Sequence, residues 1–461
     1  MSGHPLEPTG AEFRAMAEEA LEYLERFLDE IPGAPSAGLP GGEELAAALR
    51  EDAPPAAGAP FSEALAVIRE AVPRAFDTTG AGYLGYIPGG GMPGAALADL
   101  IADVTNRFTG MRFPAPALVE LEWNVLRWLA EAFGFPPGSR GILTTGGSMA
   151  TLSALVAARE ALLGEAVADG VLYLSGETHA SAVKAAKIAG IRTLRHLPTT
   201  PELRLDLDAL RTAVKEDRDA GLRPFCVVAS AGTVNTGAVD PIAETVELCR
   251  EEGVWCHVDG AYGGFFQLTE RGRERFRGIE EADSVTLDPH KGMFLPYGTG
   301  CLLVREGRRL LEAHTAGEAG YLQDLASEGE SLNFSDYSPE LSRDFRGLRV
   351  WLPLKLHGLD AFREALDEKL DLARLLYEGI RDAPGIEIPW EPELSIVAFR
   401  SPGGDEASRR MLERINASQR VFLSSTMIGG RFTLRAAILS FRTHRDRIEE
   451  AIEIIRAAAA G

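Results

Sequence analysis

Residues Ala282–Arg305 read ADSVTLDPHKGMFLPYGTGCLLVR and predict two buried strands joined by a polar turn. Ser284–Leu287 is small, β-branched and aliphatic, and Cys301–Val304 is apolar. Lys291 falls between them, where burying an ammonium is costly unless its pKa falls. A lysine with a lowered pKa can form a Schiff base with a carbonyl, whereas a lysine at a strand end can also extend to water. The stretch alone leaves both interpretations open.

Short apolar segments alternate with helical patterns on the N-terminal side of this stretch. Strands are predicted at 141–144, 171–174, 193–196, 225–230 and 255–259, with helices at 181–189, 207–217 and 242–252. This alternation predicts an α/β fold with a mainly parallel sheet covered on both faces. In such folds ligands bind at the carboxyl ends of the strands.

The N-terminal segment predicts a helical arm. Residues 9–30 form an amphipathic pattern that begins with a capping box between Thr9 and Glu12. The helix can bury its apolar stripe either on a second subunit or on its own chain. Further helices are predicted at 43–50, 61–72, 95–105 and 117–133, and the glycine-rich stretch 81–94 suggests a loop that carries aromatic residues.

The pattern changes again after residue 346. Helices are predicted at 349–357, 359–383 and 445–459, and strands at 396–399 and 431–439, which indicates a small α+β domain. We therefore expect an arm over 1–92, a large domain over 93–348 and a small domain over 349–461.

Composition excludes several classes of function. The chain has 461 residues and a net charge of −21, and so acidic a surface repels nucleic acid and anionic membranes. We find no apolar run long enough for a membrane span and no signal-peptide pattern. The four cysteines form no CxxC pair and have no metal-ligand spacing, which fits reduced thiols in a cytoplasm.

Polar groups follow four of the predicted strands. Gly147 and Ser148 suit an anion at a helix N-terminus, although a plain glycine-rich cap would look the same. His179 can cap a helix or stack on a flat ligand. Asp259 needs a partner, which a protonated ring nitrogen or a neighbouring basic side chain would supply. With Lys291 these groups describe one ligand, pyridoxal 5′-phosphate, which has a phosphate, a pyridine nitrogen and an aldehyde.

The motifs TTGGSMATL (144–152), THASAVKAA (178–186), HVDGAYGG (257–264) and DPHKGMFLPYGTG (288–300) resemble those of the group II pyridoxal-phosphate-dependent amino acid decarboxylases. That family includes the aromatic-amino-acid, histidine, tyrosine and glutamate decarboxylases. The resemblance extends over nearly the whole chain. It implies a fold of the aspartate-aminotransferase type (fold type I) and a cytoplasmic homodimer whose active sites lie at the subunit interface.

The resemblance also implies roles for individual residues. Lys291 would hold the cofactor, Asp259 would pair with its ring nitrogen, and His179 and Ala261 would lie on the two faces of the ring. The remaining cofactor contacts would come from Gly147, Ser148, Thr233 and His290. The implied reaction releases CO2 from an L-amino acid through an external aldimine and a quinonoid, and yields the amine.

The resemblance assigns the proton donor and the substrate contacts as well. Tyr337, within NFSDYSPELSRDFRGLRVW (333–351), matches a loop tyrosine that returns a proton to Cα, and a surface tyrosine is the alternative. Tyr86 matches a residue of the substrate-side loop, and Phe108 is the aromatic residue that can compensate in part for Gly110. Arg435 matches an arginine that contacts a substrate carboxylate in glutamate-type relatives, and a structural ion pair is the alternative.

Two departures from the family pattern bear on the substrate. Gly292 follows the lysine where the well-known eukaryotic members have Trp, and Gly110 stands where an aromatic residue would line the pocket. Both changes argue against an aromatic substrate. The alternative activities are an aldehyde synthase or another carbon-carbon lyase on the same fold, and a third possibility is a cofactor-binding protein without catalysis.

Overall fold

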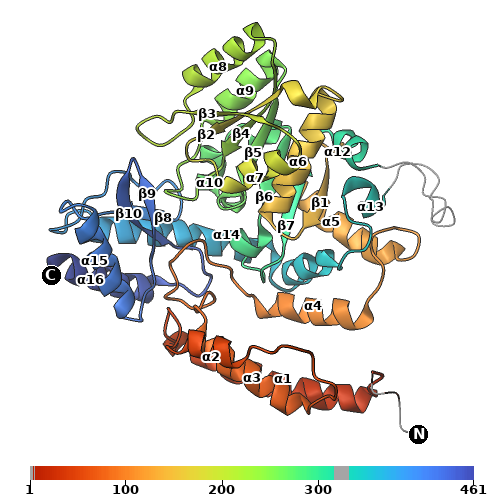
Figure 1. Cartoon of the computed structure of the whole chain (residues 1–461), viewed down its shortest axis with the longest axis vertical. Coiled ribbons are helices and arrows are strands. Elements are labelled where there is room, and N and C mark those ends of the chain that lie inside the picture. Colours follow the sequence, from red (N-terminus) through yellow and green to blue (C-terminus); the bar gives the residue numbers. More distant parts are fainter. Residues whose placement is uncertain (1–3, 5, 316–331) are drawn as a thin grey trace.

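The computed structural model describes residues 4, 6–315 and 332–461 and places a seven-stranded sheet at the centre of the chain (Figure 1). The strand order is β1-β7-β6-β5-β4-β2-β3. Strand β7 runs antiparallel to both of its neighbours, and all other pairs are parallel, so the predicted mainly parallel sheet is confirmed. The strands are β1 (Arg140–Thr144), β2 (Gly170–Ser175), β3 (Thr193–Leu197), β4 (Arg223–Ser230), β5 (Trp255–Gly260), β6 (Ser284–Leu287) and β7 (Gly300–Val304).

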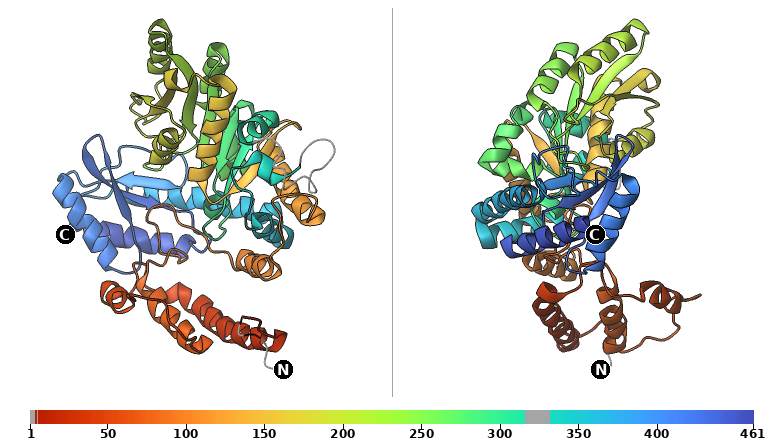
Figure 2. Two further views of the ribbon diagram at one scale, coloured as in Figure 1. Left: turned by 45° about the vertical axis from the view of Figure 1, so that its right-hand side comes forward. Right: turned by 90° about the vertical axis from the view of Figure 1, so that its left-hand side faces the viewer.

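Helices cover both faces of this sheet. Helix α6 (Gly147–Leu162) crosses one face and contacts β1, β4, β5, β6 and β7, while α9 (Ile242–Glu252) packs on β4 and β5. The right-hand view of Figure 2 shows the strands between these two helices. The other helices around the sheet are α5 (Pro116–Ala132), α7 (Ala180–Ile188), α8 (Leu207–Asp219), α10 (Glu270–Arg275), α11 (Pro289–Gly292) and α12 (Gly307–His314).

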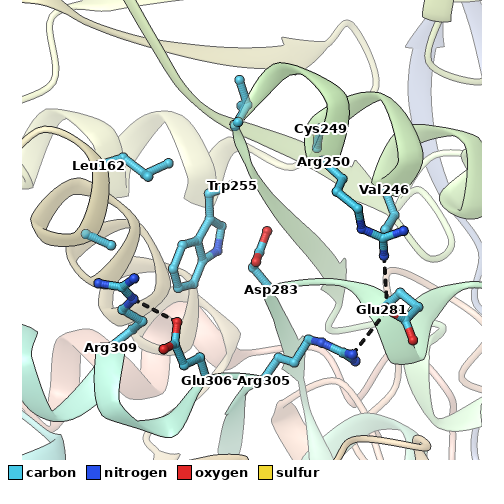
Figure 3. A pocket seen from close by; sticks show the side chains of 13 residues that line it. Leu162, Val246, Cys249, Arg250, Trp255, Glu281, Asp283, Arg305, Glu306 and Arg309 are labelled. Carbon is cyan, nitrogen blue, oxygen red and sulfur yellow. Dashed lines mark hydrogen bonds and ion pairs between the residues drawn. The ribbon is translucent and has the colours of Figure 1, made fainter.

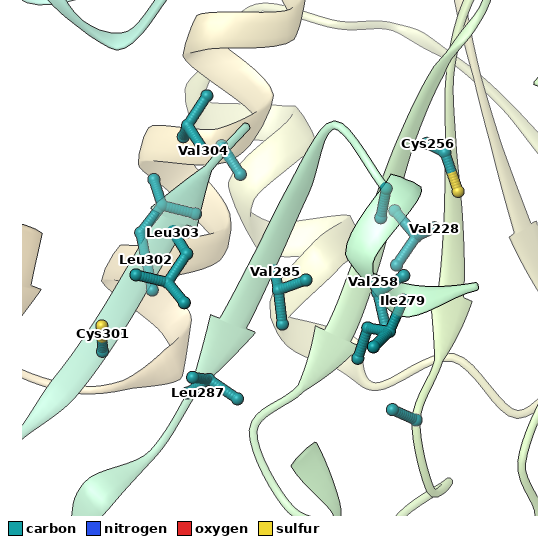
Figure 4. Close-up of a cluster of buried hydrophobic side chains, with 14 of the residues drawn as sticks. Val228, Cys256, Val258, Ile279, Val285, Leu287, Cys301, Leu302, Leu303 and Val304 are labelled. Atoms are coloured by element: carbon teal, nitrogen blue, oxygen red, sulfur yellow. The ribbon is translucent and has the colours of Figure 1, made fainter. Parts of the chain in front are cut away.

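The central strands form the hydrophobic core of the large domain. Val258, Val285 and Leu302, which come from three neighbouring strands, are fully buried (Figure 4). These strands are apolar on both faces because helices exclude water from both sides. The continuous apolar runs in the sequence therefore identified the strands correctly.

A second, three-stranded sheet carries the C-terminal part of the chain, in the order β8-β10-β9. Its elements are α14 (Arg346–Ile380), β8 (Ile396–Phe399), α15 (Asp405–Ala417), β9 (Ser424–Ile428), β10 (Arg431–Ala437) and α16 (Arg445–Ala460). The sequence did not predict β9 or α15, and it placed the end of β10 two residues too late. The break predicted between two helices at Gly358 is present as a non-helical residue inside α14. Helix α14 contacts α4 and α5 as well as α16, so the predicted boundary at 348/349 falls inside one helix that joins both regions.

The N-terminal arm projects away from the rest of the chain in both views of Figure 2. It consists of α1 (Gly10–Glu30), α2 (Gly42–Ala48) and α3 (Phe61–Ala71), and α4 (Pro93–Thr105) follows it. The capping box between Thr9 and Glu12 is present. No residue of α1 is buried, and Leu21 and Leu24 of its apolar stripe are exposed.

Residues 82–86 attach the arm to the small sheet. The N–H of Leu84 donates to the carbonyl of Phe422, and the N–H of Ala437 donates to the carbonyl of Leu84. The ring of Tyr83 stacks on that of Phe422 with their centroids 5.4 Å apart. This part of the predicted aromatic loop is therefore buried structure. Within the described residues, no helix is long and apolar enough to cross a membrane.

Candidate active site

One cleft at the carboxyl ends of β2, β4, β5 and β6 is lined by five of the predicted site residues, His179, Thr233, Asp259, Ala261 and Lys291. The cleft encloses about 390 Å³, including its opening to solvent. The carboxyl ends of parallel strands lie at the same edge of a sheet, so segments that are far apart in the sequence lie close together here. The lining residues are Ile87, Glu177, His179, Ser230, Gly232, Thr233, Val234, Asp259, Ala261, Tyr262 and Lys291.

Lys291 lies on the short helix α11, directly after β6. The prediction that it lies between two buried strands is confirmed, since β6 ends at Leu287 and β7 begins at Gly300. The short helix that begins at Pro289, a residue that suits the first helical turn, was not predicted. Lys291 Nζ forms an ion pair with Asp288 Oδ2 at 2.8 Å. Its side chain is 23% exposed and lines the cleft. The lysine is therefore both accessible and charge-compensated.

Asp259 ends β5 with its carboxylate buried in the cleft. Its Oδ1 accepts the N–H of Ala261 at 3.0 Å. Burial raises the pKa of Asp259, and the Ala261 N–H and the positive charge of Lys291 oppose that shift. No arginine or lysine forms an ion pair with Asp259 among the described residues. A protonated ring nitrogen would supply the partner that this carboxylate needs.

His179 both caps a helix and lines the cleft. Its Nδ1 accepts the N–H of Ser181 at 3.2 Å and lies 2.8 Å from Ser181 Oγ, so the capping interpretation is confirmed. The cap fixes the orientation of the imidazole at the start of α7. The ring remains exposed in the cleft, which also receives Ala261 from the end of β5. A flat ligand can be held between two such groups.

The N-terminus of α6 offers a place for an anion. No hydrogen bond forms to the backbone N–H of Gly147 or Ser148 within the described part of the chain. The position that a side chain on Gly147 would take lies 3.0 Å from Ala261 Cβ, so only glycine permits this approach to the cleft. Free N–H groups at the positive end of a long helix favour phosphate.

His290 and Thr233 lie near this cradle and the cleft. His290 Nδ1 donates to the carbonyl of Thr299 at 2.7 Å, and burial lowers the pKa of His290, so the ring is neutral at pH 7. The position of a side chain on Gly146 would lie 3.6 Å from the His290 ring, which places His290 beside the cradle. Thr233 is buried in the cleft wall, with its hydroxyl 3.3 Å from that of Thr236.

Arg435 does not form the ion pair considered from the sequence. Its Nε donates to the carbonyl of Asn235 at 3.0 Å, Nη1 donates to Ser424 Oγ at 3.0 Å, and Nη2 donates to the carbonyl of Val234. Burial lowers the pKa of Arg435 to about 10. The guanidinium therefore clamps the turn at 233–236, which forms one wall of the cleft.

The other predicted substrate and donor residues lie outside the cleft in the single chain. Tyr86 is largely exposed, with its N–H donated to Ser424 Oγ, and its neighbour Ile87 lines the cleft instead. Phe108 is partly exposed. Tyr337 is 2% exposed on α13 (Phe334–Tyr337) and packs edge-to-face on Trp123, so the alternative of a surface tyrosine is wrong.

The two unusual glycines are sites of close packing and do not line the cleft. A Cβ on Gly292 would lie 2.5 Å from Phe265 Cβ, and a Cβ on Gly110 would lie 2.3 Å from the carbonyl oxygen of Leu341. Neither glycine therefore leaves an open space where a bulky residue is missing. At each glycine, another segment of the chain occupies the space that a side chain would need.

A larger hollow lies at the opposite, amino-terminal ends of β5 and β6, and it encloses about 1000 Å³ with its opening (Figure 3). Most of its charged side chains are paired with one another: Arg250 and Arg305 both contact Glu281, and Arg309 contacts Glu306. The remaining carboxylate, that of Asp283, accepts the N–H of Cys256 at 2.7 Å. Size alone therefore does not identify the active site of this chain.

Sequence reasoning missed Glu177, Val234, Tyr262 and Asp288. Asn235 Nδ2 donates to Glu177 at 2.8 Å, and Thr426 Oγ1 donates to Asn235 Oδ1 at 2.8 Å, so the small sheet is linked to the cleft wall. Glu177 and Tyr262 each lie within three residues of an assigned site residue, and that proximity was the available signal. Val234 directly follows the assigned Thr233, so the same signal applied to it, whereas its clamp by Arg435 could not be predicted from local sequence.

This set of residues fits pyridoxal 5′-phosphate. The anion site at Gly147 and Ser148, the unpaired carboxylate of Asp259, the exposed imidazole of His179 and the accessible amine of Lys291 match the phosphate, ring nitrogen, ring face and aldehyde of that cofactor. The fit rests on donor chemistry at four separate strand ends. No other part of the described chain gathers such a set.

Comparison with known proteins agrees with this chemistry. The aromatic-L-amino-acid decarboxylase of Bacillus atrophaeus is 36% identical over 82% of this chain and 81% of its own length. The solved structure of Catharanthus roseus tryptophan decarboxylase in complex with L-tryptophan superposes with a TM-score of 0.91 at 27% identity, covering 99% of both chains. Rhodiola rosea 4-hydroxyphenylacetaldehyde synthase gives a TM-score of 0.89 at 26% identity and covers 98% of both chains.

The model of the pyridoxal-dependent decarboxylase conserved domain matches residues 84–401, which span the sheet, the cleft and the start of the small domain. The match includes every residue that lines the cleft. The chain therefore belongs to the family of pyridoxal-phosphate-dependent amino acid decarboxylases.

Proposed function

We propose that this protein converts an aromatic L-amino acid into the corresponding amine and CO2 at the Lys291 cleft, as a cytoplasmic homodimer. The observation that carries the proposal is the convergence of Lys291, Asp259 and His179 on one cleft. Pyridoxal 5′-phosphate, when bound, supplies an aldehyde that captures amines and a ring that accepts the electron pair of a broken Cα–carboxylate bond.

The residues of the chain would act as follows. Lys291 would hold the cofactor through its amine. Asp259 would stabilise a proton on the ring nitrogen, because its buried carboxylate forms no ion pair with an arginine or lysine among the described residues. His179 and Ala261 would contact the ring. Gly147 and Ser148 would offer backbone N–H groups to the phosphate, with Thr233 and His290 close by.

The proposal of an aromatic substrate draws on two findings. The named activities of the Bacillus atrophaeus and Catharanthus roseus proteins are decarboxylations of aromatic amino acids. The objection raised by Gly292 and Gly110 weakens, because packing against Phe265 and Leu341 explains both glycines. We further propose that Tyr86 and Phe108 contact the substrate and that Arg435 shapes the cleft wall.

The proton that Cα receives is proposed to come from Tyr337. Its side chain is buried against Trp123 in the single chain, so this role requires the segment to leave that position. If Tyr337 does not donate this proton to Cα, the alternative outcome is favoured, in which the product is an aldehyde. The similarity to a 4-hydroxyphenylacetaldehyde synthase keeps that alternative open to test.

The homodimer is proposed from the arm. Helix α1 has no buried residue, although its sequence forms an apolar stripe, and α4 exposes Leu97, Leu100, Ile101 and Val104. Apolar surface of this extent favours a protein interface. A second subunit would cover it, whereas no other segment of the described chain buries a residue of α1.

Product analysis tests the activity. The protein is loaded with pyridoxal 5′-phosphate and incubated with L-tryptophan, L-tyrosine, L-phenylalanine, L-histidine and L-glutamate, and amine, CO2, aldehyde and peroxide are quantified. We expect amine and CO2 in equal amounts from at least one aromatic substrate. Aldehyde and peroxide in equal amounts without amine would establish the alternative. Turnover of L-glutamate alone would refute the substrate assignment and leave the decarboxylase assignment intact.

A further inference from the structure

Asp288 is the buried acid next to the anchoring lysine, and sequence analysis gave it no role. It follows β6 and precedes α11, and only 2% of its surface is exposed. Its Oδ2 lies 2.8 Å from Lys291 Nζ, one helical turn further along the chain. The carboxylate therefore holds the amine of Lys291 in an ion pair.

The same carboxylate faces the N-terminus of α6. The position that a side chain on Gly147 would take is 3.0 Å from Asp288 Oδ2 and 3.2 Å from Oδ1. Oδ1 is buried and has no hydrogen-bond partner within the described chain. A buried carboxylate oxygen without a partner is costly. The positive end of the helix offsets part of that cost, just as it would for a phosphate.

Few other charges reach this point. Asp259 on β5 interacts electrostatically with Asp288, and Arg349 on α14 interacts with the neighbouring His290. Arg349 is already paired with Asp99 at 2.7 Å. His290 Nε2 lies 3.7 Å from Asp288 Oδ2, but burial lowers the pKa of His290 and keeps the ring neutral. Lys291 is therefore the cation that balances Asp288.

We propose that Asp288 is an internal counter-ion of Lys291 that opposes binding of the cofactor. This inference rests on the proposed function, in which phosphate binds at Gly147 and Ser148 and Lys291 anchors the cofactor. The carboxylate opposes loading in two ways. It repels the phosphate from the helix N-terminus that it faces, and it holds the lysine amine in an ion pair that must break before the amine can attack an aldehyde.

The first test measures phosphate recognition without the lysine chemistry. Pyridoxine 5′-phosphate carries the ring and the phosphate but has no aldehyde, so it cannot react with Lys291. We expect Asp288→Asn, which keeps the shape and removes the charge, to bind this probe about tenfold more tightly than the wild type. Asp283→Asn is the matched control, because Asp283 lies just before the opposite end of β6. We expect no change in its affinity for the probe.

The second test measures capture of pyridoxal 5′-phosphate as a function of pH. The rate at which the visible absorbance of the lysine adduct appears is recorded from pH 6 to pH 10, at limiting cofactor. Removal of the carboxylate should raise the rate of capture about tenfold, because the amine no longer has to leave an ion pair. Unchanged probe affinity together with an unchanged rate of capture in Asp288→Asn would overturn the proposal. A wild type that captures no cofactor at all would instead refute the proposed function.

A third measurement needs no variant and covers a failure of Asp288→Asn to fold. The cofactor-free wild type is reductively methylated with formaldehyde and cyanoborohydride at several pH values, and the labelling of each lysine is followed by peptide mass spectrometry. Lys215 on α8 is exposed and serves as the internal reference. We expect Lys291 to be labelled more slowly than Lys215 at each pH, because Asp288 holds its amine in an ion pair. Labelling of Lys291 as fast as that of Lys215 would show an unrestrained lysine and overturn the proposal.

Discussion

Arg435 Nε donates a hydrogen bond to the carbonyl oxygen of Asn235 at 3.0 Å, and this bond ties strand β10 of the small sheet to the turn that forms one wall of the cofactor cleft. The same guanidinium donates to the carbonyl of Val234 and to Ser424. A planar, forked donor suits such a set of acceptors, and lysine cannot replace it. The small domain therefore contributes to the cleft through a backbone clamp.

Arg435→Lys should weaken cofactor binding. The lysine ammonium cannot reach both carbonyls, so Val234 and its neighbour Thr233 lose their fixed position. We expect the Kd for pyridoxal 5′-phosphate to rise about tenfold, because the change removes about one hydrogen bond to a charged group. Fluorescence titration of the cofactor-free protein measures this Kd. Arg431→Lys on the same strand is the control, because the side chain of Arg431 pairs with Glu387 near the surface. A normal Kd with a raised KM for the amino acid would instead assign Arg435 to the substrate.

Gly292→Ala should destabilise the protein without altering substrate preference. The added methyl group would lie 2.5 Å from Phe265 Cβ, so the helix or the ring must shift. Overpacking of this kind costs about 1–3 kcal/mol. Urea unfolding of the cofactor-free protein measures the loss, and Gly58→Ala, which meets no atom within 4 Å, is the control. A stable Gly292→Ala variant that prefers different amino acids would show that the glycine lines the substrate site.

Acidification should destabilise the fold partly through His257. This residue is fully buried in β5, where Ser284 Oγ lies 2.8 Å from its Nδ1, and burial lowers its pKa to about 3. The unfolded chain binds the proton near pH 6.5, so the stability due to neutral His257 is complete above pH 6.5 and is lost as the pH falls toward 3.

The loss at pH 5 should be about 2 kcal/mol, as the pH lies about 1.5 units below the unfolded pKa. Buried carboxyls act in the opposite sense, since the pKa of Asp240 is raised to about 6. The comparison must therefore be between His257→Gln and the wild type, in urea unfolding at pH 7.5 and pH 5. The variant should lose less stability than the wild type on acidification. Equal losses would exclude His257 as a source of acid sensitivity.

Tyr337→Phe tests the proton donor. If the hydroxyl returns the proton to Cα, its removal should lower amine formation and raise the share of aldehyde and peroxide, because the carbanion persists long enough to meet oxygen. Trp123→Phe is the control for packing, since Trp123 contacts the same ring without a role in proton transfer. An unchanged product ratio in Tyr337→Phe, with lower thermal stability, would make Tyr337 a packing residue only.

Much of the secondary structure could be predicted from local sequence patterns. Helix α9 begins and ends at the predicted residues, and the capping box at Thr9 is present, because both depend on residues close in sequence. Strand β9 was missed because it is partly exposed and mixes polar with apolar residues. Helix α15 was missed because it is strongly charged and buries only Ser408, Met411 and Ile415.

Site residues could be predicted from the sequence where they lie close to the end of a predicted strand. Lys291, Asp259 and His179 each stand within four residues of a strand end, and all three line the cleft. Asp288 stood in the quoted motif, but its ion pair with the lysine depends on the turn into α11, which the sequence suggested only as a loop. The clamp by Arg435 joins residues about 200 positions apart, so no local pattern could reveal it.

The central claim is that Lys291 anchors pyridoxal 5′-phosphate in a catalytic cleft, and borohydride trapping tests it most directly. The loaded protein is reduced with borohydride, digested and mapped by mass spectrometry. The account predicts one pyridoxyl adduct per chain, located on Lys291, and loss of both adduct and amine formation in Lys291→Ala. An adduct on another lysine, or no adduct in a folded protein that still releases CO2 from an amino acid, would contradict it.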